Sequence, residues 1–469
     1  MAPSKTNGIA LTKLIMMIFM LTLTITMLNI GIHGFSIKLT PITSLFQTNL
    51  SLEEKHYNLF EISRTRAELN TKQHSMILSN TIPAFRGSTN YFTSKPNAIT
   101  LRPPVRRRAP SGYYMTQLSI GSKLFSPYLV MDTSTDLTWV QCEGCTNCFP
   151  VSGTGNFKYQ ESSSYHKLPC NHTLCVPKLC TSDKLYCRYH NRYRASTSTG
   201  LLSTETFTFA TNTNETTAKY TSILFGCGLD NRNLPFSAPN NVIAGIFGLA
   251  PTARSLLIQL ENKTKRRFSY CLTTSDWPTM LHFGDDATIS HRGLQTTPLV
   301  GLPKYYVSMF GISIDKTRLN ISASAFQLKS NLKGGFVFDS GSPYSFLVDN
   351  AYKILKTEMI KYIARRYPSL RPIPRGMGKF DLCYNLTTTP LPPGGYAFPP
   401  LTYHLKGADF FMTPDVVFED FGAVRCLAML IIDDDGPTIL GAFQQTNYRF
   451  LFDASLSKQS LSFAPETCV

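Results

Sequence analysis

Two short segments of this chain share a pattern, although they lie far apart in the sequence. Residues 128–135 read YLVMDTST and residues 335–342 read GFVFDSGS, so in each an apolar strand runs into an Asp, Asp132 or Asp339, that small residues follow. The repetition predicts two related halves, each with one carboxylate. Two carboxylates that face each other cannot both ionise cheaply, so they share a proton and divide into an acid and a base. The pattern indicates a site that activates water.

A second repeated element supports this interpretation, because a single Asp-Thr-Ser or Asp-Ser-Gly tripeptide usually marks only an ordinary turn. Downstream of Asp132 lies VIAGIFGL at 242–249, and downstream of Asp339 lies PTILGA at 437–442. Each Asp is therefore followed by two apolar residues and a Gly, Gly248 or Gly441. The repeat has two parts in each copy.

Several further motifs fit one known family. They are LTWVQC at 137–142, FGCG at 225–228, FSYC at 268–271, FDLCY at 380–384 and LSFAP at 461–465. With them, the chain from about Gly112 to its end resembles the pepsin-type aspartic peptidases, specifically the cysteine-rich plant group that includes the nepenthesin-like enzymes. The resemblance implies an all-β, bilobal fold in which two related β lobes flank a substrate cleft, with few short helices. It also implies an aspartic endopeptidase with Asp132 and Asp339 as catalytic residues and no metal or other cofactor.

The residue patterns after Gly112 are consistent with such a fold. β-branched or aromatic runs bounded by Gly, Pro, Asn or Ser predict strands, and two segments, 255–260 and 350–365, carry a helical pattern. The predicted strands cover 113–120, 124–131, 204–210, 305–314, 335–338 and 449–452.

The N-terminal region has a different character, and we expect four parts along the chain. Lys5 and Lys13 precede a long uncharged apolar run, which is typical of a signal peptide, here residues 1–34. An uncleaved membrane anchor is the alternative. Residues 35–108 then form a prosegment, residues 109–295 an N-terminal lobe with Asp132, and residues 296–469 a C-terminal lobe with Asp339.

The charge distribution favours a prosegment over nucleic-acid binding. Of the formal net charge of +16, residues 1–108 carry +9, from 13 Lys or Arg against four Glu, which leaves +7 for the remainder. Basic residues of a prosegment would pair with cleft carboxylates at neutral pH and release them as those carboxylates protonate. A disordered linker is the alternative. We expect a protein or peptide substrate, no nucleic acid, no stable membrane span after signal cleavage, and a monomer.

Twelve cysteines in an exported chain predict six disulfides, because the compartment is oxidising and the count is even. A zinc site in the N-terminal cluster is an alternative on spacing alone. Sequence does not define the pairing within that cluster, whereas the resemblance implies Cys383 with Cys426 and, once that pair is assigned, Cys271 with Cys468. The remaining eight are Cys142, Cys145, Cys148, Cys170, Cys175, Cys180, Cys187 and Cys227.

A secretory chain carries glycans at Asn-x-Ser/Thr triplets in its loops, although such triplets also arise by chance. The candidates are Asn49, Asn171, Asn214, Asn262, Asn320 and Asn385. We expect a secreted, extracellular protein. The alternatives are a vacuolar protein and a protein that its N-terminal segment anchors to a membrane.

The resemblance also implies roles for the residues around each Asp. Thr133 and Ser340 are expected to rigidify the loops behind the carboxylates, whereas Thr135 and Ser342 are expected to hydrogen-bond the carboxylates from the front. Tyr193 falls at the position of the family's flap Tyr, and simple packing in a hairpin is the alternative. The glycines of the family's flap are missing here, so the flap tip is expected to be stiffer and more basic.

One departure lies in the site itself, where the family has Asp-Thr-Gly and this chain has Asp132-Thr133-Ser134. The added side chain could donate a hydrogen bond or could push the two loops apart, and sequence does not choose between these outcomes. The alternative function is therefore a catalytically weak protein of the same fold that binds proteins outside the cell, as plant glycosidase inhibitors do.

Overall fold

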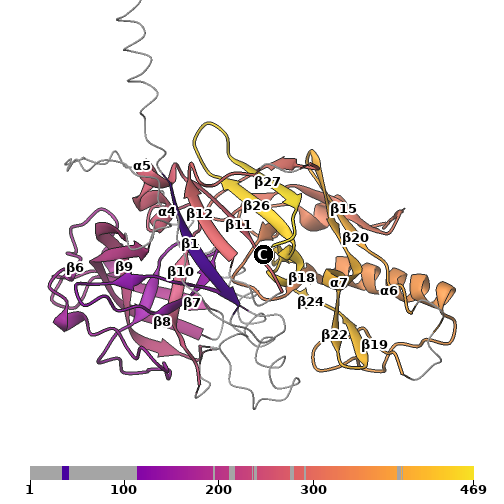
Figure 1. Cartoon of the computed structure of the whole chain (residues 1–469), viewed down its shortest axis with the longest axis horizontal. Helices are drawn as coiled ribbons and strands as arrows, with labels where there is room; N and C mark the ends of the chain where they lie inside the picture. Colours follow the sequence, from indigo (N-terminus) through magenta and orange to yellow (C-terminus); the bar gives the residue numbers. More distant parts are fainter. Residues whose placement is uncertain are drawn as a thin grey trace, which may run out of the picture.

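The computed structural model describes residues 34–41, 113–193, 196–210, 217–234, 236, 240–274, 279–289, 292–387, 392 and 395–468. The chain forms two lobes that lie side by side, the first in indigo to magenta and the second in orange (Figure 1). Strands dominate both lobes and helices are few, as the all-β prediction required.

The largest sheet has 15 strands and runs through the N-terminal lobe into the space between the lobes. Its order is β13 (Gln295–Pro298), β27 (Ser460–Pro465), β26 (Tyr448–Asp453), β11 (Arg267–Cys271), β12 (Thr279–Gly284), β1 (Gly34–Pro41), β2 (Tyr114–Gln117), β4 (Tyr128–Asp132), β10 (Ile243–Gly248), β5 (Trp139–Gln141), β9 (Thr217–Arg232), β8 (Ser196–Ala210) and β3 (Ser119–Ile120), with β6 (His166–Lys167) and β7 (Arg188–Tyr193) paired to β8.

Three smaller sheets build the C-terminal lobe. A five-stranded sheet has the order β14 (Tyr306–Val307), β17 (Phe336–Phe338), β25 (Thr438–Leu440), β18 (Ser345–Val348) and β24 (Met429–Ile432). A four-stranded sheet has the order β16 (Thr317–Arg318), β15 (Met309–Ile314), β20 (Leu401–Leu405) and β21 (Ala408–Met412), and a three-stranded sheet has β19 (Cys383–Asn385), β23 (Val424–Leu427) and β22 (Phe418–Phe421).

Helices are short except for one. The α-helices are α4 (Leu256–Gln259), α5 (Glu261–Thr264), α6 (Asp349–Arg366) and α7 (Pro414–Val417), and the 3₁₀ turns are η2 (Tyr159–Glu161), η3 (Pro177–Leu179), η4 (Ala323–Phe326) and η5 (Phe443–Gln445). Both predicted helices are present, as α4 and α6. In α6 the buried Ala351, Leu355, Met359 and Ile363 recur every four residues, so they form one apolar face against the lobe.

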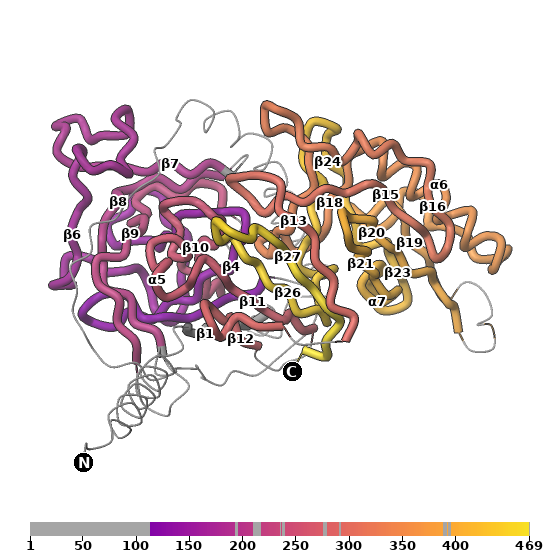
Figure 2. The backbone as a smooth tube through the Cα atoms, turned by 90° about the horizontal axis from the view of Figure 1, so that it is seen from above, coloured from indigo at the N-terminus to yellow at the C-terminus, as the bar shows by residue number. Residues whose placement is uncertain are grey.

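The two lobes are joined by strands from the C-terminus of the chain. β26 pairs antiparallel with β11, so Phe452 lies opposite Phe268, and their rings stack with centroids 4.8 Å apart. Figure 2 shows β26 and β27 between the magenta and orange halves. The disulfide between Cys271 and Cys468 closes the same junction. The chain end is therefore part of the structure that holds the lobes together.

One strand lies before Gly112, in a region where no strand was predicted. β1 lies inside the large sheet, where Phe35 pairs with Phe283 of β12 and Leu39 pairs with Thr116 of β2. It begins the segment that we predicted to be a prosegment, while residues 42–112 and the predicted signal peptide before Gly34 lie outside the described residues. Across the described ranges, no helix is long and apolar enough to cross a membrane.

Candidate active site

The two Asp-containing strands sit in sheets of the same topology. β4 pairs in parallel with β10, which pairs antiparallel with β5, which pairs in parallel with β9. In the C-terminal lobe, β17 pairs in parallel with β25, β25 antiparallel with β18, and β18 in parallel with β24. The two halves that the sequence repeat predicted are thus equivalent in their strand order and directions.

The two repeated glycines lie where two backbone segments of the same half contact each other closely. A Cβ on Gly248 would lie 2.4 Å from the carbonyl oxygen of Asp136, and a Cβ on Gly441 would lie 2.2 Å from the carbonyl carbon of Tyr344. Both distances are far below van der Waals contact. In each half, the apolar-apolar-Gly strand therefore supports the Asp loop because Gly lets the backbones touch.

Asp132 and Asp339 occur at matching places, Asp132 as the last residue of β4 and Asp339 directly after β17. Each is only 2% exposed. Asp132 Oδ1 accepts a hydrogen bond from the backbone N–H of Ser134, and Asp339 Oδ1 accepts one from that of Gly341, both at 2.9 Å. The same turn thus fixes both carboxylates.

Thr133 and Ser340 tie the two loops to each other across the lobes. Thr133 Oγ1 donates to the carbonyl of Phe338 at 2.9 Å and accepts from Ser340 N at 3.0 Å. Reciprocally, Ser340 Oγ donates to the carbonyl of Met131 at 3.1 Å and accepts from Thr133 N at 3.3 Å. These four bonds join the two Asp loops to each other.

Ser342 and Thr135 also lie at equivalent places. The Oγ of Ser342 donates to Asp339 Oδ2 at 2.8 Å, which is the contact expected at the front of the carboxylate. The carbonyl of Ser342 accepts from Ala442 N at 2.7 Å, and the carbonyl of Thr135 accepts from Ala250 N at 3.0 Å. Both loops are therefore also attached to the segment that follows the supporting glycine.

Ser134, the departure from the family motif, does not push the loops apart. The four bonds of Thr133 and Ser340 are present with the Ser side chain in place. Ser134 is 9% exposed, and its hydroxyl finds no hydrogen-bond partner within the part of the chain that the structure describes. The loop geometry thus tolerates Ser at this position.

Two contacts near the carboxylates were missed by sequence reasoning. Tyr270 of β11 is fully buried and donates from its hydroxyl to Gln445. Burial, together with the charge of Asp339, raises the pKa of Tyr270 well above its ordinary value. Tyr305 donates to the carbonyl of Leu249 at 2.6 Å, next to Gly248. Tyr270 lies in the FSYC motif and Tyr305 begins a predicted strand, but neither pattern indicates which distant atom the hydroxyl contacts.

An ion pair clamps the loop of Asp132 and was also missed. Asp136, with a side chain 15% exposed, accepts bonds from Arg254 at 2.9 and 3.0 Å and from Thr252 at 2.8 Å. Burial would raise the pKa of Asp136, but the charge and hydrogen bonds of Arg254 outweigh it, so the pKa is lowered. Pro343 occupies the corresponding place in the second loop, so this clamp belongs to the first half alone.

The lowered pKa of Asp136 predicts a pH-dependent effect for Arg254→Met. In the wild type, the stabilisation is present above the unfolded-state pKa of Asp and is lost as pH falls through the folded value. The variant leaves a buried carboxylate without its partner, which we expect to cost on the order of 3–5 kcal/mol of unfolding free energy at neutral pH. In acid, where that unpaired carboxylate becomes protonated, the deficit should shrink.

Thermal unfolding of the wild type and Arg254→Met at neutral and acid pH measures this effect. Arg232→Met is the matched control, because Arg232 also pairs with an Asp, Asp230, but is 60% exposed, and an exposed pair contributes about 0–1 kcal/mol. A deficit of Arg254→Met that is the same at both pH values would contradict the assigned role of Asp136.

The predicted flap is a β-hairpin made by β7 and the start of β8, which pairs Tyr193 with Ser196. The structure does not describe the side chain of Tyr193 or residues 194–195. The flap role of Tyr193 therefore stays a prediction. Lower in the hairpin, the buried Tyr189 shares a hydrogen bond with Ser198 at 2.7 Å. That contact anchors the base of the hairpin.

All twelve cysteines are paired, so the thiolates that the zinc alternative needs are consumed. Cys170, Cys175 and Cys180 do lie close together, but each is oxidised. The implied pairs Cys271–Cys468 and Cys383–Cys426 are both present. The four N-terminal pairs, which sequence left open, are Cys142–Cys227, Cys145–Cys148, Cys170–Cys180 and Cys175–Cys187.

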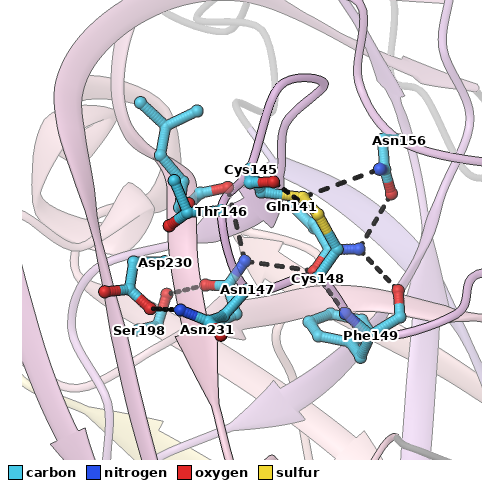
Figure 3. The surroundings of a disulfide bond; sticks show 12 residues. Gln141, Cys145, Thr146, Asn147, Cys148, Phe149, Asn156, Ser198, Asp230 and Asn231 are labelled. Atoms are coloured by element: carbon cyan, nitrogen blue, oxygen red, sulfur yellow. Dashed lines mark hydrogen bonds between the residues drawn. A yellow bond between two sulfur atoms is a disulfide. The ribbon is translucent and has the colours of Figure 1, made fainter.

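The buried side-chain amide of Gln141 in β5 holds the loop around the Cys145–Cys148 disulfide by hydrogen bonds (Figure 3). The Nε2 of Gln141 donates to the carbonyl of Phe149 at 2.7 Å and to Asn156 at 2.8 Å. Its Oε1 accepts from Phe149 N at 2.9 Å and from Asn231 at 3.1 Å. This loop is thereby attached to β9 as well as to β5.

The glycosylation candidates differ in exposure. Asn171, Asn262 and Asn320 are exposed and Asn385 is partly buried, whereas Asn49 and Asn214 lie outside the described residues. Glycosylation at these positions stays a prediction.

Comparisons with known proteins give consistent results. Residues 114–285 match the family model described as Xylanase inhibitor N-terminal, and residues 304–465 match the one described as Xylanase inhibitor C-terminal. The chain is 34% identical to aspartic proteinase nepenthesin-1 of Nepenthes gracilis over 370 residues, 77% of this chain and 79% of that protein. It is 31% identical to Aspartyl protease family protein 2 of Arabidopsis thaliana over 372 residues, 76% and 71% of the two chains.

Solved structures resemble the chain in fold. The crystal structure of edgp has a TM-score of 0.62 at 17% identity and covers 77% of this chain and 94% of its own. That of basic 7S globulin from soybean has a TM-score of 0.58 at 18% identity and covers 76% and 92%. At such identities the likeness shows the bilobal fold alone.

Proposed function

Because this chain belongs to the nepenthesin-like family of pepsin-type aspartic proteinases, we propose that it is a secreted endopeptidase that hydrolyses peptide bonds at acid pH through Asp132 and Asp339. The observation that carries this proposal is the set of four hydrogen bonds through which Thr133 and Ser340 join the two Asp loops. They hold two buried carboxylates on equivalent turns, as one shared proton requires.

The reaction follows from this arrangement. One carboxylate of the pair is ionised and takes a proton from a water molecule, which attacks the peptide carbonyl carbon. The other is protonated and hydrogen-bonds the carbonyl oxygen, and the departing amide nitrogen then takes up a proton. Because the pair titrates as a unit, neither Asp is assigned a fixed role. The Asp dyad by itself supplies the acid and the base that this reaction needs.

Secretion and zymogen maturation are part of the proposal. Complete pairing of the cysteines supports folding in an oxidising compartment. β1 supports a prosegment that is held in the zymogen by strand pairing with β12 and β2. N-terminal sequencing of the secreted protein tests this idea. We expect a start near Ala109, and a start near Phe35 would contradict it.

The test of the activity is cleavage of an acid-denatured protein at acid pH after the prosegment has been removed. We expect cleavage that pepstatin blocks and that is lost at neutral pH. The second candidate function is an extracellular protein that inhibits a glycosidase, and the two xylanase-inhibitor descriptions of the matched families are consistent with it. No cleavage by the verified mature form, together with inhibition of a xylanase, would replace our proposal with that function.

A further inference from the structure

Four polar side chains form a row across one face of the four-stranded sheet in the C-terminal lobe, to which β15 and β20 belong (Figure 1). Each strand contributes one of them: β16 Arg318, β15 Ser313, β20 His404 and β21 Asp409. The register pairs Ser313 with Arg318 and His404 with Asp409. Because Gly311 pairs with His404 and lies two residues before Ser313, all four point to the same face.

Hydrogen bonds link three of these side chains into one network, which runs from Ser313 through His404 to Asp409. Ser313 Oγ lies 2.7 Å from His404 Nε2, and His404 Nδ1 lies 2.7 Å from Asp409 Oδ1. The carboxylate on Nδ1 fixes the ring and its tautomer, which leaves Nε2 as the acceptor for the Ser proton. The backbone N–H of Asp409 donates to Gln295 at 2.6 Å, so the strand that carries the carboxylate is itself anchored.

Arg318 adds a cationic group to the face that carries this network. Its Nη2 donates to the carbonyl of Phe310 at 2.7 Å. A Cβ on Gly311 would lie 2.8 Å from the same nitrogen, so the guanidinium rests on the glycine. The space that Gly311 leaves open thus holds a donor on the sheet face that carries Ser313 and His404, and we assign it the stabilisation of a developing oxyanion.

The exposure of the row increases from Ser313 outward. Ser313 is 6% exposed, the His404 side chain 22% and the Asp409 side chain 58%. Two large apolar side chains lie open to solvent on the same strands, Phe310 at 46% and Phe411 at 44%. They offer an apolar contact to the acyl or aryl part of a small ester.

We propose that Ser313, His404 and Asp409 form a second, nucleophilic site, separate from Asp132 and Asp339, that hydrolyses activated esters of small carboxylic acids. The order of atoms, with the hydroxyl on Nε2 and the carboxylate on Nδ1, is the one that activates a serine in hydrolases of unrelated folds. Such sites are recognised by geometry and not by sequence position, which is why no motif marks this one.

The reaction balances with water as the only co-reactant. Ser313 Oγ bonds to the ester carbonyl carbon while its proton passes to His404 Nε2, and the leaving alkoxide departs with that proton as the ester C–O bond breaks. Water then gives a proton to His404 and its hydroxide adds to the acyl carbon. The bond from the acyl group to Ser313 breaks, and Ser313 regains its proton.

The test uses the secreted full chain with pepstatin present, so that its outcome does not depend on the dyad. Hydrolysis of p-nitrophenyl acetate is measured at about pH 8, where free imidazole is uncharged. A fluorophosphonate probe is then added and the labelled peptide is identified by mass spectrometry. We expect labelling of Ser313 and hydrolysis that falls at least about 10²-fold in Ser313→Ala. The exposed Ser324→Ala is the matched control and should keep the wild-type rate.

Labelling is measured on the wild-type chain, so the test survives a Ser313→Ala variant that fails to fold. No labelling, labelling at another residue, or hydrolysis that persists in folded Ser313→Ala would each overturn the proposal. Failure here would leave the acid peptidase activity untouched, because that activity is measured separately at acid pH.

Discussion

Replacing Asp132 or Asp339 by Asn is expected to lower the rate of acid proteolysis by at least about 10²–10⁴-fold. Asn keeps the shape of the side chain, and its oxygen can still accept from Ser134 N or Gly341 N. It cannot ionise or share a proton, so either change removes the division into an acid and a base. The proteolytic rate should fall by a similar factor in the two variants, because the carboxylates act as one unit.

The assay is pepstatin-sensitive cleavage of a denatured protein by the mature chain. Asp435→Asn is the matched control, because Asp435 is a carboxylate that is 53% exposed and pairs with two surface lysines, Lys329 and Lys333. Thermal unfolding of each variant shows that the fold is retained. Proteolysis that survives either dyad substitution in a folded protein would contradict the assignment of the site.

The second large effect is expected from Gly441→Ala. The new Cβ would lie 2.2 Å from the carbonyl carbon of Tyr344 and 2.7 Å from Ser345 N. Two backbones must separate to accept it, which we expect to cost about 1–3 kcal/mol of unfolding free energy. The displaced segment follows Ser342, which donates to Asp339. A shift of roughly 1 Å there should reduce the turnover number about 10²-fold.

Turnover and melting temperature are measured together for this variant. Gly301→Ala serves as the control, because a Cβ at that position meets only the end of the Leu328 side chain, at 3.2 Å. Gly248→Ala should behave like Gly441→Ala, since its Cβ would lie 2.4 Å from the carbonyl oxygen of Asp136. A Gly441→Ala protein as active and stable as Gly301→Ala would show that close backbone contact is not what the motif provides.

Local patterns accounted for much of the fold. Strand and helix propensity located β4, β17 and β26 and the helix α6, because each has an apolar repeat that matches its own geometry. The extent of β8 was underestimated, since 204–210 was predicted and Ser196–Ala210 is observed. Its first residues are polar and small, and pairing with β7 and β9 extends the strand beyond the reach of propensity.

Contacts between distant residues could not be predicted in this way. Three features join segments that share no motif. They are the ion pair of Asp136 with Arg254, the position of β1 between β12 and β2, and the hydrogen bonds that link Ser313, His404 and Asp409. Strand register decides which side chains meet, and register depends on the assembled sheet. The pairing of the eight N-terminal cysteines was open for the same reason.

The sequence by itself determined the class of the protein: two related β halves, one Asp in each, and a chemistry of paired carboxylates. Repetition of a short motif carries that information, because the same turn and the same supporting glycine recur in both halves. Tertiary structure alone decided that Ser134 leaves the bonds between the Asp loops in place. The physical reason is that whether a side chain fits depends on atoms more than 200 residues away in the chain, whose positions only the folded lobes define.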